Sequence, residues 1–432
     1  MPGRDWMTAQ PSAERLALLY RISQTFNSSL DLDEVLNRVM DEVIAATHAE
    51  RGFLMLHDAA ERLVFRAARG LDRQTIDAPE FQISRGVVER VAHEGQPQLT
   101  SDAQSDQWLG QRASVMGLGL RAVLCVPLQL KGATLGVIYV DNRVQSGIFM
   151  QDDLDLLTSI AASAATAIEN ARLYQVAVEK GRLERELQVA HEVQTSLLPR
   201  ETPHIAGWEF ATWWQPAREI SGDFYDFIPT DQDQLGVVIA DVSDKGMPAA
   251  LFMALTRSIV RASVATAFSP ADAIIHANRL ICADAVNGMF VTLCYVRLDA
   301  SGQIVYANAG HNPPLWYRAD QDQLIELTRT GMALGVLELN GYEQRTEQLN
   351  PGDFVVLYTD GVTEVVNAQQ QEFGIEHLRQ VILENRRASA AEMVTAVEQA
   401  LGGFSDLSTP FDDITVVMIK RIEKQSHPSV GG

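Results

Sequence analysis

Apolar residues in the first part of the chain recur with two different periods. Over residues 12–47 they form two helical stripes, separated by the polar break and N-cap at 27–31. Alternation then predicts a β-hairpin with strands at 52–57 and 63–68. The remaining elements expected here are a short helix at 86–92, paired strands at 122–130 and 136–140, and a helix at 153–177.

The second part of the chain is predicted to be rich in strands. Two pairs of helices interrupt the strands, and Ser389 is placed as the N-cap of the last helix. This order favours an α+β fold, an α-β-β-α sandwich, over a doubly wound parallel sheet. The strands are expected at 208–214, 224–228, 235–240, 290–298, 303–309, 314–317, 353–358 and 414–419, and the helices at 249–265, 270–285, 375–383 and 389–401.

A helical linker at 169–199 joins the two parts and shows a heptad pattern. Two seam positions are polar and one is Ala, while Gly181 lowers helix propensity by about 1 kcal/mol relative to Ala. We therefore expect either a marginal coiled coil that forms a homodimer or a single solvated helix. A helix pair of marginal stability could change between two arrangements when a ligand binds. The seam registers are Leu173, Lys180, Leu187 and Gln194, and Val176, Leu183, Ala190 and Leu197.

Composition limits the classes of partner. The 432 residues exceed one comfortable hydrophobic core, which predicts two domains. A net charge of −21 disfavours nucleic acid and anionic membranes. There is no signal-peptide core or long apolar run, so we expect a cytoplasmic protein. Cys125, Cys282 and Cys294 lie in apolar runs and are expected to be buried thiols.

Acidic motifs stand beside several predicted strands. The apolar run 235–240 leads directly into Asp241, and the other acidic motifs likewise adjoin strand-like segments. A buried strand end is a poor place for a carboxylate unless a cation meets it. Carboxylates without a His or Cys cluster suit hard divalent cations such as Mg²⁺ or Mn²⁺. The pattern therefore predicts a carboxylate metal site.

The order of elements over residues 12–174 resembles a GAF domain, a small-molecule sensor module. The segments that carry the resemblance are 28–31, 51–54, 122–128 and 135–141. They indicate the fold but leave the ligand unknown.

Residues 142–153 loosely resemble the signature of cyclic-nucleotide-binding GAF domains. Arg143 replaces a Lys and the spacing differs, so a loop followed by a helix N-cap is the preferred interpretation. His57 and His93 are either pocket ligands or ordinary surface histidines, and surface positions are the commoner case.

Five motifs in the second part occur in an order that resembles the metal-dependent PPM-type serine/threonine phosphatases of the stage II sporulation protein E branch. The resemblance covers residues 205–422, and the last residues, 423–432, are expected to be a disordered tail. The motifs are SGDFYDF at 221–227, DVSDKGMPAAL at 241–251, NAGHNPP at 308–314, LYTDGVTE at 357–364 and DDIT at 412–415.

This resemblance implies a site with two divalent ions, Mn²⁺ or Mg²⁺. Asp241 would bridge the ions with the carbonyl of Val242 beside it, and Asp223, Asp360 and Asp412 would complete the site. Phosphoserine or phosphothreonine would then be hydrolysed by metal-activated water without a covalent intermediate. Five neighbours have open roles: Asp226 and Asp413 as structural acids, Asp244 in place of a common Gly, His311 as general acid or loop residue, and Lys245 as phosphate attractor or solvated cation.

The two resemblances together imply a GAF-regulated protein phosphatase in signal transduction. Its substrate would be a phosphoprotein of the STAS-type anti-sigma-factor antagonist kind. A catalytically inactive scaffold is disfavoured by the intact set of acids, which repel one another without metal. A cyclic-nucleotide sensor is disfavoured by the degraded signature at 142–153.

Overall fold

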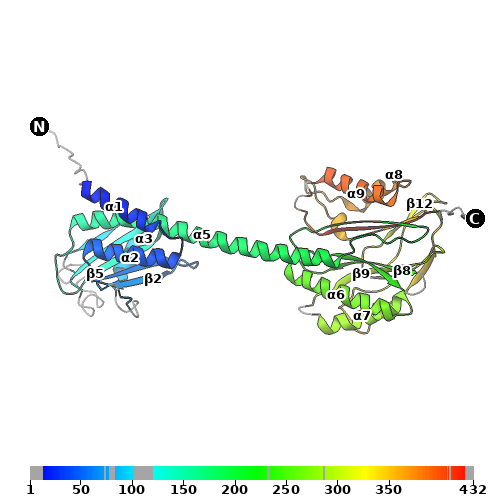
Figure 1. Ribbon diagram of the computed structural model, residues 1–432, viewed down its shortest axis with the longest axis horizontal. Helices are drawn as coiled ribbons and strands as arrows, with labels where there is room; N and C mark the ends of the chain where they lie inside the picture. Colours follow the sequence, from blue (N-terminus) through cyan, green and yellow to red (C-terminus); the bar gives the residue numbers. More distant parts are fainter. Residues whose placement is uncertain are drawn as a thin grey trace, which may run out of the picture. The chain divides into compact units, whose positions relative to one another are not determined.

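The computed structural model describes residues 13–72, 74–76, 83–101, 103, 120–230, 234–285, 288–405, 407 and 410–423. The chain divides into two compact units, Met1–Leu183 and Glu184–Gly432 (Figure 1). The start of the predicted GAF domain at Ser12 and residues 424–432 of the predicted tail lie outside the described residues.

The N-terminal unit is built on an antiparallel five-stranded sheet of order β2-β1-β5-β4-β3. Its strands are β1 (Arg51–His57), β2 (Leu63–Gly70), β3 (Gln98–Thr100), β4 (Ala122–Leu130) and β5 (Ala133–Asn142). Its helices are α1 (Ala13–Phe26), α2 (Leu32–Thr47), α3 (Arg85–Glu94) and the first part of α5 (Gln151–Leu197).

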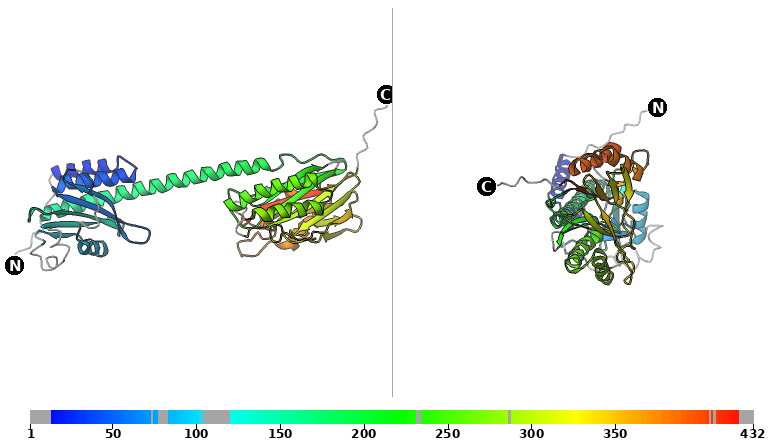
Figure 2. Two further views of the ribbon diagram at one scale, coloured as in Figure 1. Left: turned by 90° about the horizontal axis from the view of Figure 1, so that it is seen from below. Right: turned by 90° about the vertical axis from the view of Figure 1, so that its right-hand side faces the viewer.

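Helices cover both faces of this sheet. On one face α1, α2 and α5 form a core with apolar strand residues, and this core contains Phe26 of α1, Val39 of α2 and Leu124 of β4. On the other face α3 covers a smaller core around Phe53 and Tyr139, and the left view of Figure 2 shows this helix on the side of the sheet opposite to α1 and α2. The predicted helices and strands of the GAF fold are confirmed, and β3 was missed because its three residues carry too short a pattern.

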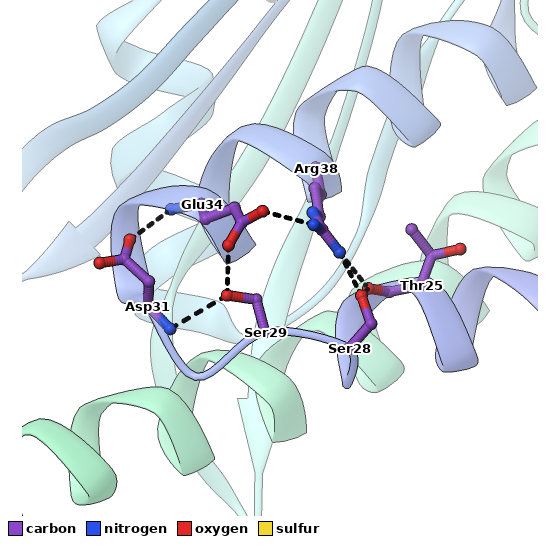
Figure 3. A network of polar contacts seen from close by, with 6 residues as sticks. All are labelled: Thr25, Ser28, Ser29, Asp31, Glu34 and Arg38. Carbon is purple, nitrogen blue, oxygen red and sulfur yellow. Dashed lines mark hydrogen bonds and ion pairs between the residues drawn. The ribbon is translucent and has the colours of Figure 1, made fainter.

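The turn between α1 and α2 is fixed by polar contacts (Figure 3). Asp31 is the N-cap of α2, and its Oδ1 accepts from the backbone N–H of Glu34 at 2.9 Å. Arg38 pairs with Glu34 and reaches back to Ser28 and to the carbonyl of Thr25. The predicted break and cap at 27–31 are therefore present.

A buried ion pair crosses the centre of the sheet. Arg51 and Asp141 are directly opposite on β1 and β5, and Arg51 Nε donates to Asp141 Oδ1 at 2.9 Å. Asp141 is fully buried, and burial raises its pKa to about 6 although Arg51 opposes the shift. The pair is therefore sensitive to loss of either partner.

The segment after β5 has the structure of a capped loop. Asn142 Oδ1 accepts from the N–H groups of Val144 and Gln145, and Asp153 Oδ2 accepts from the N–H of Met150 at the start of α5. The interpretation of 142–153 as a loop and helix cap agrees with these contacts.

The C-terminal unit is a sandwich of two antiparallel sheets. One sheet has the order β13-β10-β9-β8-β7 and the other β12-β11-β14-β15-β6. The strands of the first sheet are β7 (Phe224–Thr230), β8 (Gln234–Val242), β9 (Val291–Leu298), β10 (Gln303–Ala309) and β13 (Arg345–Gln348). Those of the second are β6 (Trp208–Gln215), β11 (Leu315–Arg318), β12 (Gln323–Glu326), β14 (Phe354–Tyr358) and β15 (Ile414–Arg421).

One helix pair packs on the outer face of each sheet, as Figures 1 and 2 show. The helices α6 (Met247–Thr266) and α7 (Pro270–Asp284) cover the first sheet. The helices α8 (Gly374–Glu384) and α9 (Ala390–Phe404) belong to the second, and Ser389 caps α9 in a capping box. The predicted α-β-β-α fold is confirmed, and the short strands β12 and β13 were missed.

Two expectations from composition can be compared with the described residues, and one of them, the burial of Cys282, is wrong. Among the described residues, only α6 is long and apolar enough to cross a membrane, and half of it is buried inside this domain, as expected for a core helix. Cys125 and Cys294 are buried and burial raises the pKa of both thiols, but Cys282 is partly exposed, so its expected burial is wrong.

We expect Arg51→Met to destabilise the N-terminal unit by about 3–5 kcal/mol, because Asp141 would be left as an uncompensated buried charge. Hydrogen exchange of peptides covering β1 and β5 would accelerate accordingly, and the double variant with Asp141→Leu should recover most of the protection. Arg62→Met serves as the control, since its pair with Asp58 is at the surface. Equal protection in Arg51→Met and wild type would refute the role assigned to the pair.

Candidate active site

The acidic motifs meet at one end of the sandwich. Asp223 directly precedes β7 and Asp241 lies near the end of β8, while Asp360 follows β14 and Asp412 precedes β15. The register of β7 and β8 pairs Phe224 with Ala240, which places Asp223 beside Asp241. Four carboxylates that are far apart in sequence thus come from strand ends of both sheets to one rim.

Asp223 is the most buried of these acids and is held by the opposite sheet. It is 1% exposed, and its Oδ2 accepts hydrogen bonds from the hydroxyls of Thr359 and Thr415, both at 2.7 Å. Burial, followed by the charges of Asp241 and Asp413, raises its pKa well above the ordinary value. Asp223 is therefore an acid fixed in position beside Asp241.

Asp241 and Asp360 are each repelled by the charge of a neighbouring acid. Burial and then the charge of Asp360 raise the pKa of Asp241, and a hydrogen bond from Asp223 opposes this shift. Burial and then Asp412 raise the pKa of Asp360. A cation placed among these groups would relieve both the repulsion and the desolvation.

Lys245 is the cation that this rim already contains. Its Nζ lies 2.8 Å from Asp412 Oδ2, donates to the carbonyl of Phe411 at 3.1 Å, and stands over the Phe411 ring. Lys245 follows Asp244, whose φ of 82° is in the region that favours glycine. This explains why a Gly at position 244 would be comfortable.

Asp413 has a structural position distinct from that of Asp412. Its two oxygens accept from the backbone N–H groups of Ala217 and Gly222, both at 2.7 Å. Asp413 thereby anchors the loop that leads to Asp223, which agrees with the capping role considered for it.

Asp226 points away from the rim. It is buried and lies 3.1 Å from Arg257 Nε and 3.4 Å from Arg261 Nε, both on α6. This ion pair ties β7 to α6, so the structure places Asp226 in a structural role rather than among the clustered acids.

The end of α5 packs against the same loop. The carboxamide of Gln194 donates to the carbonyl of Ser221 at 2.8 Å and accepts from its N–H at 3.0 Å, two residues before Asp223. His191 stacks on Trp214 with ring centroids 5.9 Å apart. Gln194 is buried here, so its assignment to the coiled-coil seam is wrong.

The donor set fits hard divalent cations. It consists of carboxylates and the Val242 carbonyl, which are the oxygen ligands that Mg²⁺ and Mn²⁺ prefer. In the described part of the chain, no three His, Cys, Asp or Glu side chains already form a complete ligand group. Mg²⁺ commonly keeps several waters and takes only one or two carboxylates, so an incomplete protein shell is compatible with it.

The sequence did not reveal the residues that hold the acids. Thr359 and Thr415 lie inside the recognised motifs, but their convergence on Asp223 depends on the packing of two sheets. Gln194 looked like a seam residue because the heptad count continued through it. A polar residue at a seam position was the available signal that it had another partner.

An α-β-β-α sandwich with clustered carboxylates at one rim defines the fold and site of a PPM-type, protein phosphatase 2C-like enzyme. Comparison with known proteins gives the same class. Residues 231–422 match the profile of the stage II sporulation protein E family, and residues 29–169 match a GAF domain profile. Asp223 precedes the matched range, so its place in the site rests on the geometry.

Three individual proteins illustrate what this chain is similar to. The phosphoserine phosphatase RsbU of Bacillus subtilis (strain 168) is 30% identical over 240 residues, covering 55% of this chain and 71% of that protein. Protein IcfG of Synechocystis sp. is 29% identical over 299 residues, covering 63% of this chain and 46% of that protein. The SiaA-PP2C domain of Pseudomonas aeruginosa is 21% identical with a TM-score of 0.51, covering 57% of this chain and 100% of that domain.

The chain therefore belongs to the RsbU family of SpoIIE-type phosphatases, with a GAF domain preceding the phosphatase domain. This family is part of the metal-dependent PPM class of serine/threonine protein phosphatases. The predicted family and enzyme class are confirmed.

We expect Asp413→Ala to destabilise the fold and Asp412→Ala to leave its stability largely unchanged. Asp413→Ala leaves two backbone N–H groups without an acceptor and should lower the free energy of unfolding by about 1–3 kcal/mol for each. Asp412→Ala removes repulsion with Asp360 and should leave folding intact. Urea unfolding followed by tryptophan fluorescence measures both, and a destabilised Asp412→Ala beside a stable Asp413→Ala would reverse the assignment.

Proposed function

We propose that this protein hydrolyses phosphoserine or phosphothreonine on a protein substrate, using two Mn²⁺ or Mg²⁺ ions held by Asp223, Asp241, Asp360, Asp412 and the carbonyl of Val242. The observation that carries this proposal is the convergence of four carboxylates from both sheets on one rim, with Asp241 in the middle. Family membership supports it.

The bound ions would supply a nucleophilic water and neutralise charge on the phosphate oxygens. Asp241 would lie between the ions because acids from both sheets face it. Asp223 would keep Asp241 oriented, since two threonine hydroxyls hold Asp223 itself. Lys245, which is 41% exposed at the mouth, would attract the phosphate and release Asp412 to the metal.

The substrate we propose is a STAS-type anti-sigma-factor antagonist in its phosphorylated form. The support is membership of the family that contains a phosphoserine phosphatase, RsbU. The reaction would take place in the cytoplasm.

The GAF domain would regulate this activity by binding a small molecule. An open cavity of about 660 Å³ between β1, β2 and α3 is a candidate ligand site, and both His57 and His93 line it. His57 Nδ1 is 3.1 Å from the Thr134 carbonyl, and Nε2 is the ring nitrogen that does not make this contact.

A homodimer through α5 would carry the signal. Leu173, Val176 and Leu183 are about half exposed on this helix, as unpaired seam residues would be. At the other end, Gln194 contacts Ser221 beside Asp223, so a change in the helix would reach the acidic rim.

We expect Asp241→Asn to abolish Mn²⁺ binding and to lower turnover by about three orders of magnitude, because metal supplies several kcal/mol of transition-state stabilisation. Hydrolysis of p-nitrophenyl phosphate and of a phosphoserine peptide, with Mn²⁺ and with EDTA, measures turnover, and calorimetry measures binding. Asp244→Asn is the matched control, since this exposed acid contacts only the N–H of Lys245 in the described network. Turnover like wild type by metal-bound Asp241→Asn would sink the assignment.

We expect Leu183→Glu to shift the protein toward monomer and to change its basal phosphatase rate, because two charges would face each other in the seam. Light scattering after size exclusion measures the mass. Val189→Glu is the matched control, since Val189 is equally exposed on α5 but outside both seam registers. An unchanged mass and rate in Leu183→Glu would reject the dimer proposal.

A further inference from the structure

Three polar residues form a row across the inner face of the first sheet at the rim. Asp223 lies beside Asp241, and the register of β8 and β9 pairs Asp241 with Thr292. Residues directly opposite each other share a face. Leu293, the next residue on β9, packs against α6 and α7, so alternation turns Thr292 toward the second sheet. Asp241 therefore has one polar neighbour on each side.

Asp223, the neighbour of Asp241 on the β7 side, is hydrogen-bonded to residues of the second sheet. Asp223 accepts from Thr359 and Thr415, which belong to the segments that carry Asp360 and Asp412. These hydrogen bonds fix one flank of the acidic rim across the sandwich.

The neighbour on the β9 side contacts His311, whose loop leads from β10 into β11 of the second sheet. The hydroxyl of Thr292 lies 2.8 Å from His311 Nδ1. The other ring nitrogen, Nε2, is buried without a hydrogen-bond partner among the described residues, and the backbone of Tyr358 is close enough to the ring to oppose the lowering of its pKa. Tyr358 ends β14, two residues before Asp360. His311 thus lies between the strand next to Asp241 and the strand that leads to Asp360.

The loop around His311 is itself held on both sides. Its N–H donates to Asn308 Oδ1 at 2.8 Å, and its carbonyl accepts from Arg329 Nε at 3.0 Å. The side chain is 1% exposed, and burial lowers its pKa to about 3, so the ring is neutral in the physiological range. These properties suit a fixed spacer and do not suit a general acid, which must reach the leaving oxygen in its protonated form.

We propose that His311 is a positioning residue that, together with Thr292, sets the distance between Asp241 and Asp360 across the two sheets. The proposal rests on the proposed two-metal site. It adds the contact of Thr292 with His311 on one side of Asp241 to the contacts of Asp223 with two threonines on the other side. Groups that orient metal ligands in this way typically change metal affinity or activity by about 10- to 100-fold when removed.

Mn²⁺ titration calorimetry on the full chain tests the proposal without using turnover. Thr292→Val is nearly isosteric and removes only the hydroxyl, and His311→Leu removes the whole spacer. Both should raise the Mn²⁺ dissociation constant by about 10- to 100-fold. His311→Asn keeps a polar atom near the Nδ1 position and should restore much of the affinity. His276→Gln, at an exposed position on α7, should bind like wild type.

The pH–rate profile at saturating Mn²⁺ separates a spacer from a general acid. For a spacer, the three variants should keep the profile of wild type and approach its kcat.

Native Mn²⁺ affinity in a folded Thr292→Val protein overturns the proposal, as does a changed acid or base limb in His311→Asn with native affinity. If His311→Leu does not fold, Thr292→Val decides. Wild-type protein that binds no Mn²⁺ would refute the proposed function and this inference together, whereas normal wild-type binding with unaffected variants would refute the inference alone.

Discussion

Mutual repulsion among carboxylates is the constraint on which the phosphatase domain depends. Asp223, Asp241 and Asp360 all have pKa values raised by burial and by neighbouring acids, in a chain whose net charge is already −21. No single strand could hold such a group in place. The fold divides the acids between two sheets. Threonine hydroxyls fix Asp223, and backbone N–H groups fix the neighbouring Asp413. A cation placed among these acids would relieve the repulsion.

This arrangement makes the rim sensitive to whatever holds its edges. The loop before Asp223 is held by Asp413 at Gly222 and by Gln194 at Ser221. Strand β7 is held by the ion pair between Asp226 and α6. A displacement of the α5 terminus or of α6 would therefore act on Asp223 through short, direct contacts, without any change in the core of either sheet.

The fold could be predicted from the sequence wherever a pattern was long enough. The helices of both domains and all strands of more than four residues were found, whereas β3, β12 and β13 carry three or four residues each. The four acids of the predicted site come from the resemblance to the phosphatase family, and the structure places each of them where a strand ends or begins. The residues that hold the acids could not be predicted. Thr359 reaches Asp223 only because the two sheets pack face to face, and His311 reaches Thr292 only because the loop after β10 lies beside β9.

Two arrangements compete for Gln194 at the end of the linker helix. The pattern counts Gln194 as a seam residue, yet its carboxamide is buried against Ser221 and Ala250. A coiled coil that extended to this position would have to withdraw the side chain from the loop before Asp223 and leave the N–H of Ser221 without its acceptor. Since an orphaned buried N–H costs about 1–3 kcal/mol, the two arrangements differ by an energy that a bound ligand can supply. In the proposed dimer, a change in α5 would therefore reach the acidic rim through Gln194.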